Sequence, residues 1–270
     1  MIQSQQQAEE VKDIENQFLK MTTHPYLKKH IDSAEIEYDI IFFLLEIMKE
    51  TSLTTEEKRE QILSALLVQA AFLTHEKVHN TKLEDSMEKK PRQLTVLAGD
   101  FFSSLYYFML VKNVHDDILP VFSSSIQKIN VEKMSLHFSE HQSEDELMKR
   151  LETVEGGFIS DIALFYKKNE LAFLAENFFL LKRLFKEREK SNSKYLSAFA
   201  SAIHSFREGY RADEITNWPP ARTSSFLNEK ISELQVKLQN QLDTYPAIHK
   251  VPLYNRLKNW INMECEAKIK

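Results

Sequence analysis

The sequence predicts an all-α protein, folded as a single helical-bundle domain that spans residues 1–270. Three observations predict this class. Only 4 Gly and 7 Pro occur in the chain, too few for the regular series of turns that a strand-rich fold needs. Apolar residues recur at three- and four-residue steps, which is the spacing of one face of an α-helix. A hydrophobic content of 43% lets a chain of this length bury a large core.

The expected helices share this spacing and differ in the signals that start and stop them. They cover approximately residues 6–21, 34–50, 55–80, 92–112, 116–138, 143–155, 158–166, 171–190, 191–210, 223–242 and 252–267. In the helix at 171–190 the apolar face consists of Phe178, Leu181, Leu184 and Phe185. The leucine and isoleucine seam between Leu227 and Leu242 is typical of packing against another helix of the same chain.

Local signals set the ends of these helices. His24-Pro25 stops the first one, because the residue before a proline is disfavoured in a helix. Thr54-x-x-Glu57 and Ser143-x-x-Glu146 have the pattern of capping boxes that start two others. Gly156-Gly157 predicts a kink or a break, and Asn217-Trp218-Pro219-Pro220 predicts a turn.

Composition excludes several function classes. The single cysteine, Cys265, allows neither an internal disulfide nor a thiolate cluster for zinc, which favours a reducing cytoplasm. A net charge of −5 and a pI near 6.0, with mixed signs, do not provide the basic face that a nucleic-acid binder needs. No apolar run approaches the roughly 18 residues that span a bilayer, and the polar N-terminus is unlike a signal peptide. We therefore expect a cytoplasmic protein with at most peripheral membrane contact.

The most apolar helical segment is the stretch from Arg92 to Tyr107, RQLTVLAGDFFSSLYY, which follows a polar connection at 81–91. Gly99 interrupts its apolar face. Because a glycine in a helix costs about 1 kcal/mol against alanine, it is expected where another backbone or a neighbouring group needs the room. The segment VLAGDFF resembles the (V)LxGDxL sequence that follows the first aspartate-rich motif of trans-polyprenyl diphosphate synthases, which have the all-helical isoprenoid synthase fold.

This resemblance implies two aspartate-rich clusters, whose carboxylates hold Mg²⁺ ions against an allylic diphosphate. The first cluster, HDDxxD, falls on residues 75–80. His75 matches, but Glu76, Lys77 and Asn80 stand in place of the three aspartates. A lysine ammonium repels a divalent cation, so this metal site is interpreted as lost.

The second cluster of the family, FQxxDDxxD, falls on residues 178–186. Its three aspartates are replaced by Lys182, Arg183 and Lys186, so the charge of the cluster is inverted. The Lys-Thr pair that contacts diphosphate in the family corresponds to Ser160-Asp161. We therefore expect no catalytic residue, metal or cofactor in this chain.

One other acidic motif, His115-Asp116-Asp117, resembles an aspartate-rich cluster superficially. It lies after the glycine-aspartate helix, not before it, and Pro120 replaces the last aspartate. Asp116 or Asp117 is expected to cap the start of the next helix. The nine histidines are scattered, and none has the HExxH spacing of a zinc site.

Taken with the helical order, these features resemble the small subunit, component I, of the heterodimeric heptaprenyl or hexaprenyl diphosphate synthases of Gram-positive bacteria. The segments that carry this resemblance are His24-Pro25-Tyr26-Leu27-x-x-His30-Ile31, Leu67-Val68-Gln69 and residues 92–100. The resemblance implies a non-catalytic subunit that a large catalytic subunit requires, with both aspartate clusters and the Mg²⁺ in that partner. It also implies that the heterodimer extends farnesyl diphosphate with isopentenyl diphosphate to the prenyl tail of menaquinone, and that this chain helps to set product length.

Two other functions remain open at this point. A helical scaffold or apolar-ligand carrier would have kept the fold and lost the enzyme partner. A self-sufficient lyase or synthase would anchor a diphosphate through Lys182, Arg183 and Lys186. The first predicts indifference to any prenyl synthase, and the second predicts turnover without a partner.

The central helix supplies the candidate residues for subunit contact. It has more aromatic rings than one helix face can direct into its own core, and buried interface centres favour aromatic side chains. Phe102, Tyr106 and Tyr107 are therefore the candidates for the subunit interface. Phe101, Leu105 and Met109 lie at four-residue steps and are candidates for the floor of a prenyl tunnel, where bulk would end elongation.

Overall fold

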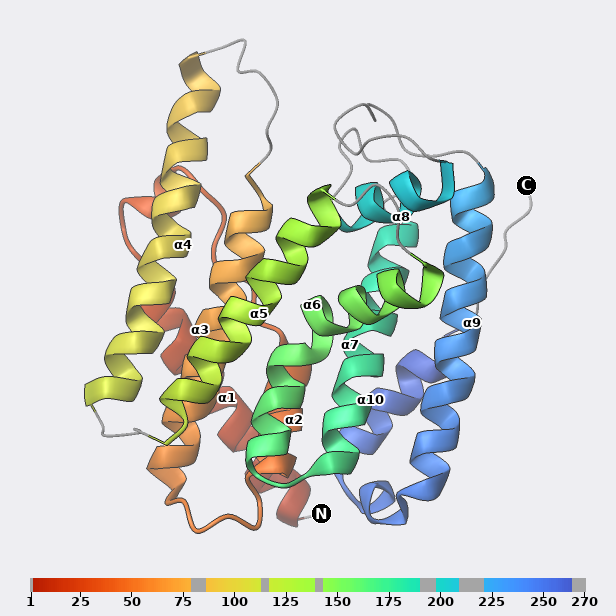
Figure 1. Cartoon of the computed structure of the whole chain (residues 1–270). Coiled ribbons are helices and arrows are strands. Elements are labelled where there is room, and N and C mark those ends of the chain that lie inside the picture. Colours follow the sequence, from red (N-terminus) through yellow and green to blue (C-terminus); the bar gives the residue numbers. More distant parts are fainter. Residues whose placement is uncertain are drawn as a thin grey trace. The chain divides into compact units, whose positions relative to one another are not determined.

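The structure is a computed structural model that describes residues 2–78, 86–112, 117–138, 143–189, 198–208 and 221–263. Within these ranges every regular element is a helix, which confirms the all-α prediction. Contacts divide the chain into two compact units, Met1–Leu119 and Pro120–Lys270, each of which has its own buried apolar core. Figure 1 shows the helices along the chain.

The first unit is built around one long helix, α3, which packs against three others. Its elements are α1 (Ile2–Thr22), η1 (Leu27–Lys29), α2 (Tyr38–Ile47), α3 (Thr55–Glu76) and α4 (Ser86–Lys112). The capping box at the start of α3 is confirmed, since Glu57 N–H donates to Thr54 Oγ1 and Thr54 N–H donates to the Glu57 carboxylate. Helices α3 and α4 run side by side (Figure 1), so the end of α3 lies against the helix that carries the glycine-aspartate pair.

Helix α4 begins six residues before the expected start at 92, and Pro91 lies inside it. Pro91 was expected at the end of the polar connection at 81–91. Proline lacks the N–H that a helix interior uses. Here Pro91 is the sixth helical residue, close enough to the N-terminus for only the first turns to be affected. The Thr95 hydroxyl donates to the Pro91 carbonyl at 2.9 Å, so this part of the helix gains a side-chain contact.

The second unit is built around α7, which packs against α6, α9 and α10. Its elements are α5 (Leu119–Phe138), α6 (Glu144–Phe165), α7 (Asn169–Glu189), α8 (Ala198–Glu208), α9 (Ala221–Thr244), η4 (Pro246–Lys250) and α10 (Pro252–Ile261). The apolar face expected for α7 is confirmed, because Phe178, Leu181, Leu184 and Phe185 are all buried. The seam of α9, from Leu227 to Leu242, is also buried within this unit.

Helix α6 does not break at Gly156-Gly157, contrary to one of the two outcomes expected there. It remains continuous from Glu144 to Phe165 and changes direction along its length in Figure 1. The two glycines have different surroundings. A Cβ on Gly156 would lie 2.7 Å from the Ala175 carbonyl oxygen of α7, whereas a Cβ on Gly157 would meet only Thr153 at 3.5 Å. Gly156 therefore permits the close approach of two helix backbones.

Several sequence predictions fall on residues outside the described ranges. These are Asn80, Asp116, the turn at 217–220 and Cys265. Asp117 lies in a turn ahead of α5, whose first residue is Leu119, three residues later than expected. The hydroxyl of Ser143 accepts from Glu146 N–H at 3.2 Å at the start of α6, which is one half of the predicted capping box. The Glu146 carboxylate accepts from Arg150 Nη2 at 2.7 Å.

Candidate functional site

The residues at the first cluster position lie at the C-terminal end of α3. His75 and Glu76 are its last two residues, and Lys77 is the C-cap. The Lys77 ammonium lies 2.8 Å from the Glu35 carboxylate. A cation at a helix C-terminus is favourable because it lies near the negative end of the helix dipole. Lys77 therefore has local electrostatic partners of the kind that stabilise a helix end, where the synthase motif would place a metal-binding carboxylate.

Gly99 makes room for the ring of His75. A Cβ built on Gly99 would lie 2.5 Å from both Cε1 and Nε2 of the imidazole, which is inside van der Waals contact. Nε2 of the same ring lies 3.6 Å from the Asp100 carboxylate. His75, the one residue of the first cluster that matches the family, thus packs against the glycine-aspartate pair of α4. The sequence indicated that a neighbouring group needs the room at Gly99. It did not identify His75, because that residue belongs to a different helix, α3.

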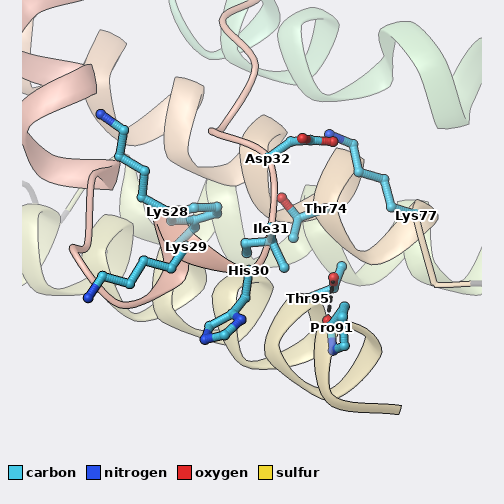
Figure 2. Close-up of a pocket in the computed structure, with 10 residues that line it drawn as sticks. Lys28, Lys29, His30, Ile31, Asp32, Thr74, Lys77, Pro91 and Thr95 are labelled. Atoms are coloured by element: carbon cyan, nitrogen blue, oxygen red, sulfur yellow. Dashed lines mark hydrogen bonds between the residues drawn. The ribbon is translucent and has the colours of Figure 1, made fainter. Parts of the chain in front are cut away.

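A pocket of about 420 Å³ opens beside this helix end, between the η1 segment, α3 and α4 (Figure 2). Its lining residues are Lys28, Lys29, His30, Ile31, Asp32, Thr74, Lys77, Pro91, Thr95 and Phe102. Figure 2 shows Lys28 and Lys29 extending outward on diverging paths, with Lys77 reaching toward Asp32. Among the described residues that line the pocket, Asp32 is the single carboxylate, and divalent cations need several oxygen ligands. The pocket is therefore unsuited to a Mg²⁺ site, and sequence reasoning had no pattern that pointed to it.

At the second cluster position, Arg183 is part of the interior of the second unit. It is 8% exposed, and its Nε lies 2.8 Å from a carboxylate oxygen of Glu187, which is 1% exposed. Glu155 of α6 lies 3.7 Å from the same guanidinium, which also stacks 5.0 Å from the centre of the Phe199 ring. The guanidinium is thus compensated by two carboxylates and an aromatic face, as a buried charge requires.

The neighbouring lysines of the second cluster have different surroundings. The Lys182 ammonium lies 5.2 Å from the centre of the Trp260 ring of α10 and 5.7 Å from that of Phe178. Such cation–π contacts orient the side chain toward α10. Lys186 is exposed. Within the described residues, no group of three or more His, Cys, Asp or Glu could hold a metal ion.

The pair that corresponds to the diphosphate-binding Lys-Thr is also used for packing. The Ser160 hydroxyl donates to Glu176 of α7 at 2.8 Å. Asp161 lies 3.7 Å from the Lys128 ammonium of α5. An aspartate at this position repels an anionic substrate, so the pair does not provide a diphosphate site.

The aromatic residues of α4 divide between the interior and the surface. Phe102 is 3% exposed and packs within its own unit, and its place at a subunit interface stays a prediction. Tyr106 is half-buried, and that burial raises the pKa of its phenol. Tyr107 is 54% exposed and Phe108, which sequence reasoning did not select, is 60% exposed. Leu97 and Val111 are exposed at helical steps from Phe108, and this second apolar stripe was a signal already present in the sequence.

The tunnel-floor candidates are all half-buried in the first unit. They are Phe101, Leu105 and Met109. The ring of Phe101 meets that of His24 edge-on, at 6.5 Å between centroids, and that of Phe102 at 5.9 Å. Their role in a tunnel stays a prediction.

Helix α4 also corrects the expectation that no segment is apolar enough to cross a membrane. The helical segment Lys89–Lys112 has the length of a membrane-spanning helix and contains an 18-residue window with a mean hydropathy of 1.5, of which 28% is buried. Buried core helices of other proteins can have the same length and apolar composition. What distinguishes α4 is a large exposed apolar surface, of the kind that marks an interaction site.

Comparison with known proteins places this arrangement in a family. A sequence profile of heptaprenyl diphosphate synthase (HEPPP synthase) subunit 1 matches residues 24–232, more than three quarters of the chain. The chain belongs to this family. Component 1 of heptaprenyl diphosphate synthase from Geobacillus stearothermophilus is 28% identical over 138 residues, which cover 51% of this chain. The match spans 61% of the length of that relative.

Solved structures that resemble this chain include polyprenyl synthases, which confirms the fold class. Octaprenyl pyrophosphate synthase from Helicobacter pylori has a TM-score of 0.59 at 14% identity and covers 94% of this chain and 99% of its own. Decaprenyl diphosphate synthase from Rhodobacter capsulatus has a TM-score of 0.62 at 10% identity, with 96% of each chain covered. Geranylgeranyl pyrophosphate synthase from Lactobacillus brevis has a TM-score of 0.63 at 9% identity, again with 96% of each chain covered. At such identities the likeness concerns the fold alone.

Proposed function

We propose that this chain is the non-catalytic subunit of a heterodimeric long-chain prenyl diphosphate synthase. Its partner is a catalytic subunit that carries both aspartate-rich clusters and the Mg²⁺, and the pair extends farnesyl diphosphate with isopentenyl diphosphate in the cytoplasm. The product is the precursor of the menaquinone tail. The observation that carries the proposal is Arg183, which occupies an aspartate position of the synthase motif and is buried in an ion pair with Glu187.

The charges at both cluster positions support a loss of catalysis. Ionisation of an allylic diphosphate needs Mg²⁺ ions held by several carboxylates, since the ions neutralise the leaving group. At the first position, Glu76 is followed by Lys77, which pairs with Glu35. At the second, Lys182 and Arg183 are cations. The residues present do not fit the metal, so no step of the reaction is assigned to this chain.

The same contacts argue against a stand-alone enzyme that binds diphosphate through its cations. Arg183 would have to leave Glu187 and the Phe199 ring to reach an anion, and removing one partner of a buried ion pair typically costs about 3–5 kcal/mol. Lys182 would have to leave three aromatic rings. Exposed Lys186 alone is too little to hold a diphosphate.

The surface that we assign to the partner is the exposed apolar stripe of α4. It consists of Leu97, Tyr107, Phe108 and Val111, hereafter the α4 stripe. An isolated helical scaffold has no reason to leave these side chains in water, because burying a large apolar side chain contributes about 1.5–3 kcal/mol. This observation favours a subunit over the scaffold.

An affinity measurement tests the partner surface. The double variant Tyr107→Ala/Phe108→Ala should bind the catalytic subunit at least about 30-fold more weakly, since hot-spot truncations cost about 2 kcal/mol or more. Val236→Ala is the matched control, because Val236 is 62% exposed on α9, in the other unit. Undiminished affinity of the double variant would remove the α4 stripe as the interface.

A second part of the proposal concerns product length. A growing prenyl chain gains about 0.8 kcal/mol per buried methylene while the tunnel has space, so a side chain at its end fixes the length. We assign that role to Phe101, Leu105 and Met109, which lie on the same helix as the α4 stripe and are half-buried. Their position next to the proposed interface supports the assignment.

A further inference from the structure

The end of the α6–α7 hairpin has exposed apolar side chains that no function above uses. Leu164 and Phe165 close α6, and Phe173 lies in the second turn of α7; they are 47%, 38% and 58% exposed. Lys167 lies between them on the connection and is also exposed. Exposed apolar side chains that gather at one place on a domain mark interaction sites more often than singly scattered ones do.

These apolar residues lie on one side of the hairpin. The Ser160–Glu176 hydrogen bond marks the line along which α6 and α7 face each other. At about 100° per residue, Leu164 is rotated about 40° from Ser160, and Phe173 about 60° from Glu176. Because the helices are antiparallel, both rotations lead to the same side. Leu164 and Phe173 therefore border a common surface at the end of the hairpin, with Phe165 beside it.

The connection places a lysine where a helix end usually has glycine. Lys168 N–H donates to the Ala163 carbonyl at 2.8 Å and Lys167 N–H to the Leu164 carbonyl at 2.9 Å, the two bonds of a Schellman motif. The motif puts Lys167 in the left-handed region, with φ of 58°. A glycine would avoid the steric cost of that conformation. The lysine thus places a positive charge beside the exposed rings at the expense of local stability.

We propose that Leu164, Phe165, Lys167 and Phe173 form a docking surface for an anionic lipid bilayer, hereafter the hairpin tip. Residues 164–173 contain two lysines and one glutamate, a net charge of +1 in a chain of net charge −5. Apolar side chains flanked by lysine are the composition that enters the headgroup region of a membrane. The lysine favours anionic phosphates there.

A bilayer fits this surface better than a protein does. A stable protein interface buries about 800 Å² on each partner and involves about 20–30 residues. Three apolar side chains at the end of a hairpin are too few for that, whereas shallow insertion into a membrane needs only a few. The inference rests on the proposed function in one respect: a long-chain prenyl diphosphate has an apolar tail that belongs in a bilayer, so docking would bring the enzyme to the destination of its product.

Vesicle co-sedimentation of the chain paired with its catalytic subunit tests the inference. The probes are vesicles of phosphatidylcholine alone and vesicles that also contain phosphatidylglycerol. We expect binding to both, stronger to the anionic vesicles. Phe173→Ser should weaken binding about ten-fold or more. Lys167→Gln should weaken binding to the anionic vesicles alone by about five-fold, which corresponds to about 1 kcal/mol for one lysine at a membrane surface. Glutamine in the left-handed region has the same steric cost as lysine, so this variant changes only the charge.

Two matched variants control for general effects of surface change. Val236→Ser removes an apolar side chain of nearly equal exposure, 62% against 58% for Phe173, from α9. Lys149→Gln removes another exposed lysine, on α6. Vesicle binding should persist in both.

Three results would overturn the inference: no binding of the pair to either vesicle, equal binding by Phe173→Ser and the unaltered pair, or loss of vesicle binding in Val236→Ser. A Phe173→Ser variant that fails to bind the catalytic subunit would identify a protein contact and would overturn it as well. Turnover of the pair in detergent reports separately on the proposed function. A pair that turns over but ignores vesicles contradicts only the membrane surface, and a pair that binds vesicles without turnover contradicts only the enzyme assignment.

Discussion

Replacing Gly156 by alanine should destabilise the second unit, whereas the same change at its neighbour Gly157 should stabilise it. The structural cause is the different surroundings of the two positions. A Cβ on Gly156 would lie 2.7 Å from the Ala175 carbonyl oxygen and 2.9 Å from Glu176 N, both of them backbone atoms of α7. A Cβ on Gly157 would meet only a methyl group of Thr153, at 3.5 Å.

The magnitudes follow from these distances. Carbon atoms make their best contacts at about 3.5–4.0 Å, so α6 and α7 would have to separate by roughly 1 Å near Gly156. Overpacking of this kind costs about 1–3 kcal/mol and exceeds the helix-propensity gain of about 1 kcal/mol from glycine to alanine. At Gly157 only that gain applies. Because both variants share that gain, they should differ in free energy of unfolding by the overpacking cost, about 1–3 kcal/mol.

Urea unfolding followed by far-ultraviolet circular dichroism measures this difference. The midpoint should fall for Gly156→Ala and rise slightly for Gly157→Ala relative to the unaltered chain. Equal midpoints for the two variants would refute the close approach of α6 and α7 at Gly156. A third variant, Gly99→Ala, should change stability little, because the atoms it meets belong to the His75 ring, which is part-exposed and can rotate away.

Three further outcomes are expected. Arg183→Met should lower the free energy of unfolding by about 3–5 kcal/mol, because it leaves the Glu187 carboxylate buried, and Arg183→Met/Glu187→Leu should recover much of that loss in the same urea assay. Tyr38 donates to a Glu15 carboxylate oxygen at 2.6 Å, and this bond raises the pKa of Tyr38 above 10.0. The bond therefore stabilises the fold below pH 10.0, and this contribution is lost as the pH rises through the raised pKa. Tyr38→Phe should flatten the stability–pH curve in that range. Phe101→Ala in the heterodimer should lengthen the product by one or more five-carbon units on chromatographic sizing, whereas an unshifted product would show that Phe101 only packs within its own unit.

Much of the fold could be predicted because helical periodicity is local. The buried face of α7, from Phe178 to Phe185, and the capping box at Thr54 depend on residues within a few positions of one another, and both are confirmed. The inverted charge of the second cluster could also be seen from the sequence alone. Its structural use could not, because Glu155 and Phe199 come from α6 and α8, distant in sequence from Arg183.

The remaining differences also arise from tertiary contacts. Phe102 and Phe108 are both aromatic residues of one apolar helix, and the packing of that helix within its unit decides that the first is buried and the second exposed. Gly156 predicted an interruption because glycine weakens a helix, whereas its role is to admit the α7 backbone. The Lys167 turn gave no signal, since a left-handed position is ordinarily recognised by glycine.

Prenyl-transfer turnover, measured while this chain is titrated into a fixed amount of the catalytic subunit from the same organism, tests the central claim most directly. The substrates are farnesyl and isopentenyl diphosphates in the presence of Mg²⁺. The account predicts no turnover by this chain alone and turnover that rises with added chain until the two subunits are equimolar. Elongation of farnesyl diphosphate by this chain without its partner, or turnover by the partner that is indifferent to this chain, would contradict it.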